Sequence, residues 1–195
     1  CFALTRWDRL SEERALHVYG PEPTEEFVKL LLGEDGAFAP DWKCRIGDET
    51  SQQMHVRRGG ELPRPAPVFD VQNLNSGDEV AADDWRMIAR SVQHCQPGLK
   101  SLAYRAETAE GSVVFGGDCA LCDPLVELAD GADSLLLACA MTGPSEDDTV
   151  LTQCITGSVD AARAAAEASV TRLRCTHAAP GPVRQEWRET ALSEA

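Results

Sequence analysis

Short apolar blocks separated by turn residues run along the whole chain, and their periodicity predicts strands first and alternating helices and strands later. Helices are predicted from Thr24 to Gly33, from Pro124 to Leu128, and over the alanine-rich stretch that begins at Ser158. Strands are predicted at residues 15–19, 68–74, 85–92, 101–107, 112–115, 133–139 and 171–175. This order of elements predicts an α/β protein with a mixed sheet.

Two segments lack a regular pattern. Residues 34–67 are rich in Gly, Pro and charge and predict an irregular loop region, and residues 181–195 predict a polar C-terminal tail. A chain of 195 residues is long enough to bury a sizeable core, so we expect one domain over residues 1–195. No apolar run approaches the roughly 20 residues that cross a bilayer, so no membrane partner is expected.

Charge and cysteine usage narrow the classes of partner. The chain carries 32 Asp and Glu against 18 Lys and Arg, a net charge of −14, and such a surface repels phosphate backbones and disfavours nucleic acid. The nearest basic patch, Arg57, Arg58 and Arg64, is interpreted as a solvated loop. Eight cysteines are spread along the chain, which favours reduced thiols and a cytoplasmic setting. Cys119 and Cys122 form a CxxC, but no second CxxC completes a four-thiolate site.

Only four histidines are present, so each can be weighed. His17 lies inside a predicted strand and favours a structural role, and His55 lies in the polar loop, where we expect it to be exposed. His94 and His177 each come just after a predicted strand, and Asp118 ends another strand behind two glycines. Imidazole nitrogen and carboxylate oxygen are ligands that suit zinc and similar ions, so these three residues form a candidate metal site.

Four segments of the chain carry a resemblance to a known family. Two of them are Ser91-Val-Gln-His-Cys-Gln-Pro-Gly-Leu-Lys-Ser-Leu-Ala-Tyr-Arg105 and Val113-Val-Phe-Gly-Gly-Asp-Cys-Ala-Leu-Cys-Asp123, the second followed by Leu128-Ala-Asp-Gly-Ala-Asp133. The others are Arg172-Leu-Arg-Cys-Thr-His177 and Tyr19-Gly-Pro-Glu-Pro-Thr24. Together they resemble the metallo-β-lactamase fold, specifically its ribonuclease Z-like and arylsulfatase-like branch.

The resemblance implies an αββα sandwich with a two-metal site at one edge of the sheets. It implies that His94 binds one metal, that His177 binds the other, and that Asp118 bridges the two and takes part in catalysis. The metals implied are two zinc or manganese ions, which activate water for attack on an ester or phosphodiester. A small-molecule ester or phosphodiester is therefore the implied substrate.

The chain departs from the family pattern in ways that keep alternatives open. The family motif H-x-H-x-D-H lies before the region that resembles residues 1–8, and no H-x-H occurs in this sequence. Ala138 and Cys154 stand where relatives carry histidine. One hypothesis is the later portion of a longer metallohydrolase, incomplete at its N-terminus, which the start at Cys1 favours. Such a chain would expose a sheet edge and self-associate, giving a homo-oligomer.

A second hypothesis is a catalytically inactive, degenerate relative that acts as a binding module and holds no metal on its own. The substitutions at Ala138 and Cys154 favour it. A third is a plain α/β domain whose likeness to the family is only structural.

Overall fold

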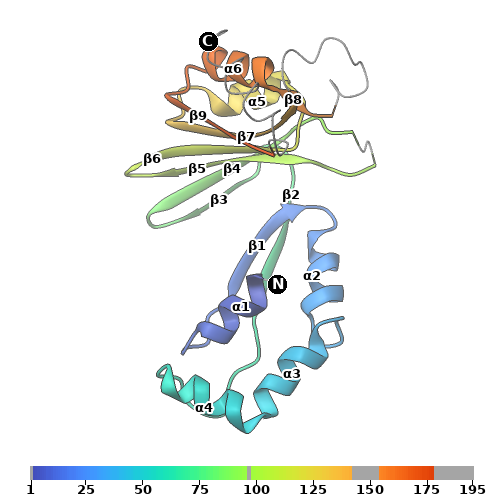
Figure 1. Cartoon of the computed structure of the whole chain (residues 1–195), viewed down its shortest axis with the longest axis vertical. Helices are drawn as coiled ribbons and strands as arrows, with labels where there is room; N and C mark the ends of the chain where they lie inside the picture. The colour runs from blue at the N-terminus through green and yellow to red at the C-terminus, as the bar shows by residue number, and fades with distance from the viewer. Residues whose placement is uncertain (1, 96–97, 142–153, 178–195) are drawn as a thin grey trace. The chain divides into compact units, whose positions relative to one another are not determined.

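The computed structural model describes residues 2–95, 98–141 and 154–177, and these form two compact units, Cys1–Leu74 and Asn75–Ala195, where the sequence predicts one domain (Figure 1). The predicted tail at residues 181–195 lies outside the described residues. No helix within the described ranges combines the length and the hydropathy needed to span a bilayer. Each unit is described separately below.

The N-terminal unit combines four helices with a two-stranded parallel sheet. In that sheet β1 (Leu16–Pro21) pairs with β2 (Phe69–Leu74), and both strands match the alternation in the sequence. The helix predicted from Thr24 is α2 (Thr24–Leu32), which Gly33 terminates. The other helices are α1 (Phe2–Arg9), α3 (Ala39–Gly47) and α4 (Glu49–Arg57).

The prediction of an irregular loop over residues 34–67 is wrong, because α3 and α4 occupy much of it. Both helices carry few apolar residues, so hydrophobic periodicity does not reveal them. Residues that favour a helix N-terminus mark where they begin. A proline occupies the first turn of α3, and at the start of α4 the Asp48 carboxylate accepts a 2.8 Å hydrogen bond from the Ser51 backbone N–H.

The buried face of α2 also differs from expectation. The apolar run in this helix predicts Phe27, Val28, Leu30 and Leu31 as the buried side, whereas the structure buries Leu32 and leaves Phe27, Leu30 and Leu31 about half exposed, at 54%, 58% and 48%. Leu32 packs with Leu4, Ala39 and Trp42 in the small apolar cluster of this unit.

The C-terminal unit is built on a seven-stranded mixed sheet, as the sequence predicts, with two helices on one face (Figure 1). Strands β3 to β6 pair antiparallel in order, β6 and β7 pair parallel, and both β8 and β9 pair parallel with β7. Of these strands, β3 and β8 have no counterpart in the sequence prediction. The strands are β3 (Glu79–Ala82), β4 (Trp85–Ser91), β5 (Leu102–Thr108), β6 (Gly111–Gly117), β7 (Ser134–Met141), β8 (Thr156–Gly157) and β9 (Arg172–Thr176).

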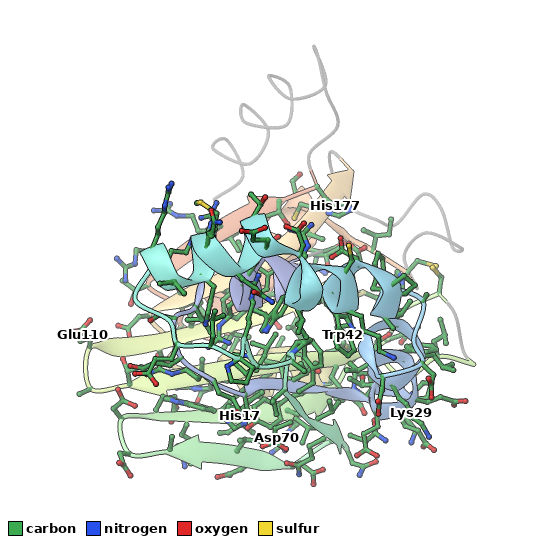
Figure 2. All side chains as sticks on the ribbon, turned by 90° about the horizontal axis from the view of Figure 1, so that it is seen from below. His17, Lys29, Trp42, Asp70, Glu110 and His177 are labelled. Carbon is green, nitrogen blue, oxygen red and sulfur yellow. The ribbon has the colours of Figure 1, made fainter. Side chains whose placement is uncertain are left out.

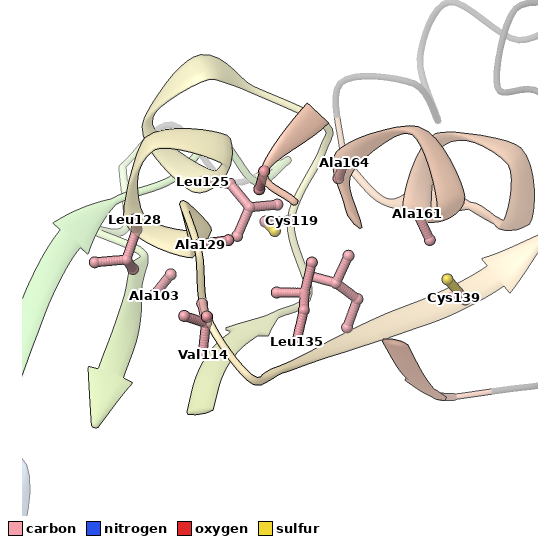
Figure 3. Close-up of a cluster of buried hydrophobic side chains, with 13 residues drawn as sticks. Ala103, Val114, Cys119, Leu125, Leu128, Ala129, Leu135, Cys139, Ala161 and Ala164 are labelled. Carbon is pink, nitrogen blue, oxygen red and sulfur yellow. The ribbon is translucent and has the colours of Figure 1, made fainter. Parts of the chain in front are cut away.

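Helices α5 (Asp123–Ala129) and α6 (Ser158–Glu167) cover this sheet and close its core (Figure 3). Leu125 of α5 and Leu135 of β7 are fully buried, and α6 contributes the small side chains of Ala161 and Ala164. Small residues let the helix backbone approach the sheet closely, and each fully buried leucine contributes about 1.5–3 kcal/mol of hydrophobic stabilisation. The sheet of the C-terminal unit is therefore closely packed against α5 and α6.

Candidate metal site

Three of the predicted site residues follow strands that end at the same edge of the sheet. Strands β6, β7 and β9 are mutually parallel, and β4 runs in the same direction because two antiparallel pairings separate it from β6. His94, Asp118 and His177 come after β4, β6 and β9, respectively. In open α/β sheets, the carboxyl ends of parallel strands are where ligands bind.

Asp118 and His177 are brought together across β7. The His177 Nε2 lies 3.9 Å from the Asp118 Oδ2, and both side chains are largely exposed. In β7, Ala138 is buried and lies opposite Thr176, the residue before His177, in the strand register. An exposed contact of this length contributes little to the stability of the fold. The contact matters because it brings two groups that can bind a metal ion close together.

The backbone at this point adopts a rare conformation. His177 has a φ of 62°, in the left-handed region that residues other than glycine seldom occupy, and Gly117 has a φ of 67° just before Asp118. Glycine adopts this conformation readily, but for a residue such as His177 it costs about 1 kcal/mol or more, and residues strained in this way concentrate at functional sites. Here they turn the chain out of β6 and β9 immediately before and at the two side chains that meet.

His94 is half-buried and held by a different contact. Its Nδ1 lies 2.7 Å from the backbone oxygen of Cys154, which precedes β8. Because a carbonyl oxygen only accepts hydrogen bonds, Nδ1 is the donor in this contact. The backbone N–H of Ala120 donates to the Gln93 oxygen at 2.9 Å, which ties the His94 segment to the segment that follows Asp118.

The geometry of Asp118 and His177 fits a shared cation. Metal–nitrogen and metal–oxygen bonds of about 2.0–2.2 Å allow two ligands of one ion to lie at most about 4.2 Å apart, and the observed 3.9 Å is within that limit. Among the residues that the structure describes, however, no three His, Cys, Asp or Glu side chains form a metal-binding group. The structure therefore joins two of the three predicted ligands, and their role as metal ligands stays a prediction.

Comparisons with known proteins decide the fold. No family model matches the chain. An uncharacterized protein of Mycobacterium leprae is 34% identical over 89% of this chain and 55% of its own length. A ribonuclease Z of Mycobacterium tuberculosis is 27% identical over 98% of this chain and 68% of its own length.

Among solved structures, the metallo-β-lactamase fold protein YhfI of Bacillus subtilis superimposes with a TM-score of 0.62 over 92% of this chain and 58% of that protein, at 19% identity. The chain has the metallo-β-lactamase fold. The resemblance drawn from the sequence motifs is thus confirmed. The chain spans about half the length of the Mycobacterium leprae protein and of the other mycobacterial proteins that it resembles at 31% identity.

The CxxC cysteines of this metallo-β-lactamase fold do not have the character of a redox pair. Cys119 is completely buried, and burial, followed by the nearby Cys122 and Asp118, raises the pKa of its thiol to about 12. A reactive dithiol needs a lowered thiol pKa and access to solvent. None of the seven cysteines that the structure describes forms a disulfide.

Of the two remaining histidines, His17 lies in a strand as the sequence predicts, whereas His55 differs from its prediction. His17 is exposed on β1, where its Nδ1 lies 2.9 Å from the Asp70 Oδ2 on the neighbouring strand (Figure 2). His55, predicted to be exposed, is 2% exposed, and neither of its ring nitrogens has a hydrogen-bond partner among the described residues. A side chain at Gly60 would overlap the His55 ring, so this burial depends on a close tertiary contact.

The predicted basic loop is likewise not a solvated patch. Arg64 is buried, its Nη2 donates to the Asp8 Oδ1 at 2.8 Å, and its guanidinium lies 4.2 Å from the centre of the Trp7 ring. Arg58 pairs with the same carboxylate at 3.2 Å. These contacts border a cavity of about 560 Å³ in the N-terminal unit, which no local pattern in the sequence indicates.

Proposed function

We propose that this chain forms part of a metal-dependent hydrolase that cleaves small ester or phosphodiester substrates. The observation that carries the proposal is the approach of His177 to Asp118 at 3.9 Å, on the strand ends of a metallo-β-lactamase fold. The name of the related ribonuclease Z supports phosphodiester chemistry. The net charge of −14 favours a small substrate over RNA.

Zinc or manganese is the proposed cofactor, with two ions in the full family site. A bound divalent cation lowers the pKa of water to about 7 and stabilises negative charge that develops on the substrate. The chain's own residues would hold such an ion: Asp118 offers carboxylate oxygens, His177 offers Nε2, and His94 offers Nε2 from a ring whose Nδ1 faces the Cys154 oxygen.

A binding module without catalysis is the second candidate. It is supported by Ala138 and Cys154, which replace the histidines of relatives, and by the lack of any three-ligand group in the described part of the chain. A protein of this kind would keep the fold and lose the metals. The hydrolase should therefore bind metal ions, whereas the binding module should bind none.

Metal analysis of the purified full chain separates them. The hydrolase proposal expects bound zinc or manganese that is lost in Asp118→Ala and His177→Ala, together with hydrolysis of bis(p-nitrophenyl) phosphate that falls at least 100-fold in both variants. His17→Ala is the matched control, because this exposed histidine also faces a carboxylate but belongs to the N-terminal unit. A wild-type chain that binds neither metal would contradict the hydrolase and favour the binding module.

We further propose a cytoplasmic setting with reduced thiols, together with self-association. The lack of disulfides among the seven described cysteines supports the first point, and the open edges of the two-stranded β1–β2 sheet support the second. Thiol titration of the protein as isolated and small-angle scattering test them. Oxidised cysteine pairs would contradict the first, and a monodisperse monomer would contradict the second.

A further inference from the structure

The cavity beside Asp8 has no role in the proposed hydrolase. It measures about 560 Å³ and lies within the N-terminal unit, where residues of α1 and α3 form its wall together with Arg58 at the end of α4. Cavities of about 300–1,000 Å³ are the size that binds small organic ligands. This cavity can therefore hold a molecule larger than a single inorganic ion.

Arginine side chains gather around this cavity, although the chain as a whole is strongly acidic. A fourth arginine, Arg64, is buried against the Asp8 carboxylate, and Asp8 and Asp41 are the acidic residues of the wall. Four guanidinium groups facing two carboxylates leave a local excess of two positive charges, in a chain of net charge −14. The three arginines of the wall are Arg9, Arg45 and Arg58.

The Asp8 carboxylate does not use all the donors that surround it. The Arg45 Nη1 lies 3.9 Å from the Asp8 Oδ1, which is too far for a hydrogen bond. The hydrogen bonds from Arg58 to Asp8 all come from its Nη1, and a guanidinium group carries five N–H donors. Both arginines therefore keep N–H groups for a further acceptor.

Arg9 adds a positive charge that no carboxylate balances. It is exposed in the last turn of α1, and among the described residues it takes part in neither an ion pair nor a hydrogen bond. Leu4 and Phe38 supply apolar surface to the same wall, and Phe38 is 41% exposed. Cationic donors beside an exposed aromatic ring fit an anion that carries an organic group.

We propose that this cavity binds a small organic phosphate monoester, with its phosphoryl group on Arg9, Arg45 and Arg58 and its organic group on Phe38. The planar guanidinium matches the geometry of phosphate oxygens, and a dianion balances the local excess of two positive charges. The acidity of the whole chain repels long polyanions and so favours a small ligand. The site belongs to the N-terminal unit and does not depend on the proposed hydrolase.

Calorimetric titration of the full chain with phenyl phosphate at pH 8 and low salt tests the inference, because this ester is then a dianion. The titrations use an Asp118→Ala background, so that no metal at the candidate site captures the anion. Arg9→Ala should weaken binding at least fivefold and Arg9→Glu should abolish it, with unchanged circular dichroism because Arg9 is exposed. Arg57→Ala is the matched control, since this neighbouring exposed arginine does not line the cavity, and its affinity should stay within twofold.

Two further variants test the roles of the wall. Asp41→Asn removes the carboxylate that holds the Arg45 Nε and Nη2, and it should tighten binding at least threefold. A purely structural role of the arginines would give no such gain. Inorganic phosphate should bind more weakly than phenyl phosphate, and Phe38→Ala should remove that difference.

The outcomes that would overturn the inference are distinct from those that bear on the hydrolase. Absence of phenyl phosphate binding, equal losses in Arg9→Ala and Arg57→Ala, or no gain in Asp41→Asn would contradict the phosphate site. Equal affinity for the two anions would contradict an organic ligand, and tighter binding of a 5′-phosphorylated oligonucleotide would contradict a small one. All these titrations use chains without Asp118, so the hydrolase stands or falls on its metal content alone.

Discussion

The two units of the chain are stabilised in different ways. The C-terminal unit closes a continuous apolar core in which Val114, Leu125 and Leu135 have no exposed surface. The N-terminal unit has a small apolar cluster around Leu32 and Trp42, and it leaves Phe2, Phe27 and Leu30 more than half exposed. Apolar packing therefore stabilises the C-terminal unit, whereas polar contacts contribute more to the stability of the N-terminal unit.

The main polar contact of the N-terminal unit is a network around Asp8. Arg64 is buried against this carboxylate and against Trp7, and Arg58 reaches the same carboxylate from the end of α4. Helices with so few buried apolar residues rely on such contacts to fix their arrangement. The candidate metal site lies instead on the unit with the closed core, where rigid strands can position its side chains.

Truncation of the C-terminal core should have the largest effect on stability. Leu135→Ala removes a side chain with no exposed surface near the start of β7 and leaves a cavity, which should lower the free energy of unfolding by about 3–4 kcal/mol. Urea denaturation followed by circular dichroism measures the loss. A change below 1 kcal/mol would show that this core is not closely packed.

Removal of the buried guanidinium should have the next largest effect. Arg64→Ala leaves the Asp8 carboxylate with fewer partners and uncovers Trp7, which should cost about 2–3 kcal/mol. Tryptophan fluorescence during urea denaturation reports on this unit through Trp7 and Trp42, provided that Trp85 and Trp187 are replaced by Phe in every protein compared. Arg57→Ala is the matched control, because this arginine at the end of α4 is exposed and should contribute no more than about 0.5 kcal/mol. Equal losses in the two variants would contradict the special role of Arg64.

The contrast between the units also explains what the sequence could predict. The strands of the C-terminal unit are recognisable because alternating or continuous apolar runs, such as Leu135 to Cys139, reflect burial on a sheet. Asp118 and His177 could be selected because each follows such a strand. Their approach depends on the pairing of β6, β7 and β9, which no local pattern encodes.

The errors fall where tertiary contacts outweigh local composition. Arg64 and His55 occur in a polar stretch and are nevertheless buried, one by Asp8 and Trp7 and the other by the close approach of Gly60.

The charge on Asp8 makes the stability of the N-terminal unit dependent on pH. Burial alone would raise the pKa of this carboxyl, but hydrogen bonds from Arg64 and Arg58 outweigh it and lower the pKa below its ordinary value of 3.8. A carboxyl with a lowered pKa in the folded state stabilises the fold above its unfolded pKa, and this contribution is lost as the pH falls through the folded value.

The wild-type chain should therefore be more stable than Asp8→Asn at pH 6, and the difference should shrink as the pH falls below about 4. Urea denaturation of both proteins at several pH values, followed by tryptophan fluorescence, measures the difference. The comparison cancels the titration of the other carboxylates. A difference that stays constant down to pH 2 would contradict the lowered pKa.

The smallest effect is expected on the exposed side of α2, where two leucines two positions apart give a matched test. Leu30 is 58% exposed and Leu32 is 8% exposed. Leucine and alanine have similar helix propensities, so Leu30→Ala should change the free energy of unfolding by no more than about 0.5 kcal/mol, whereas Leu32→Ala should cost about 2–3 kcal/mol. If Leu30→Ala proved as costly as Leu32→Ala, another surface must cover this side of the helix in solution, and the contrast between a closed and an open apolar unit would no longer hold.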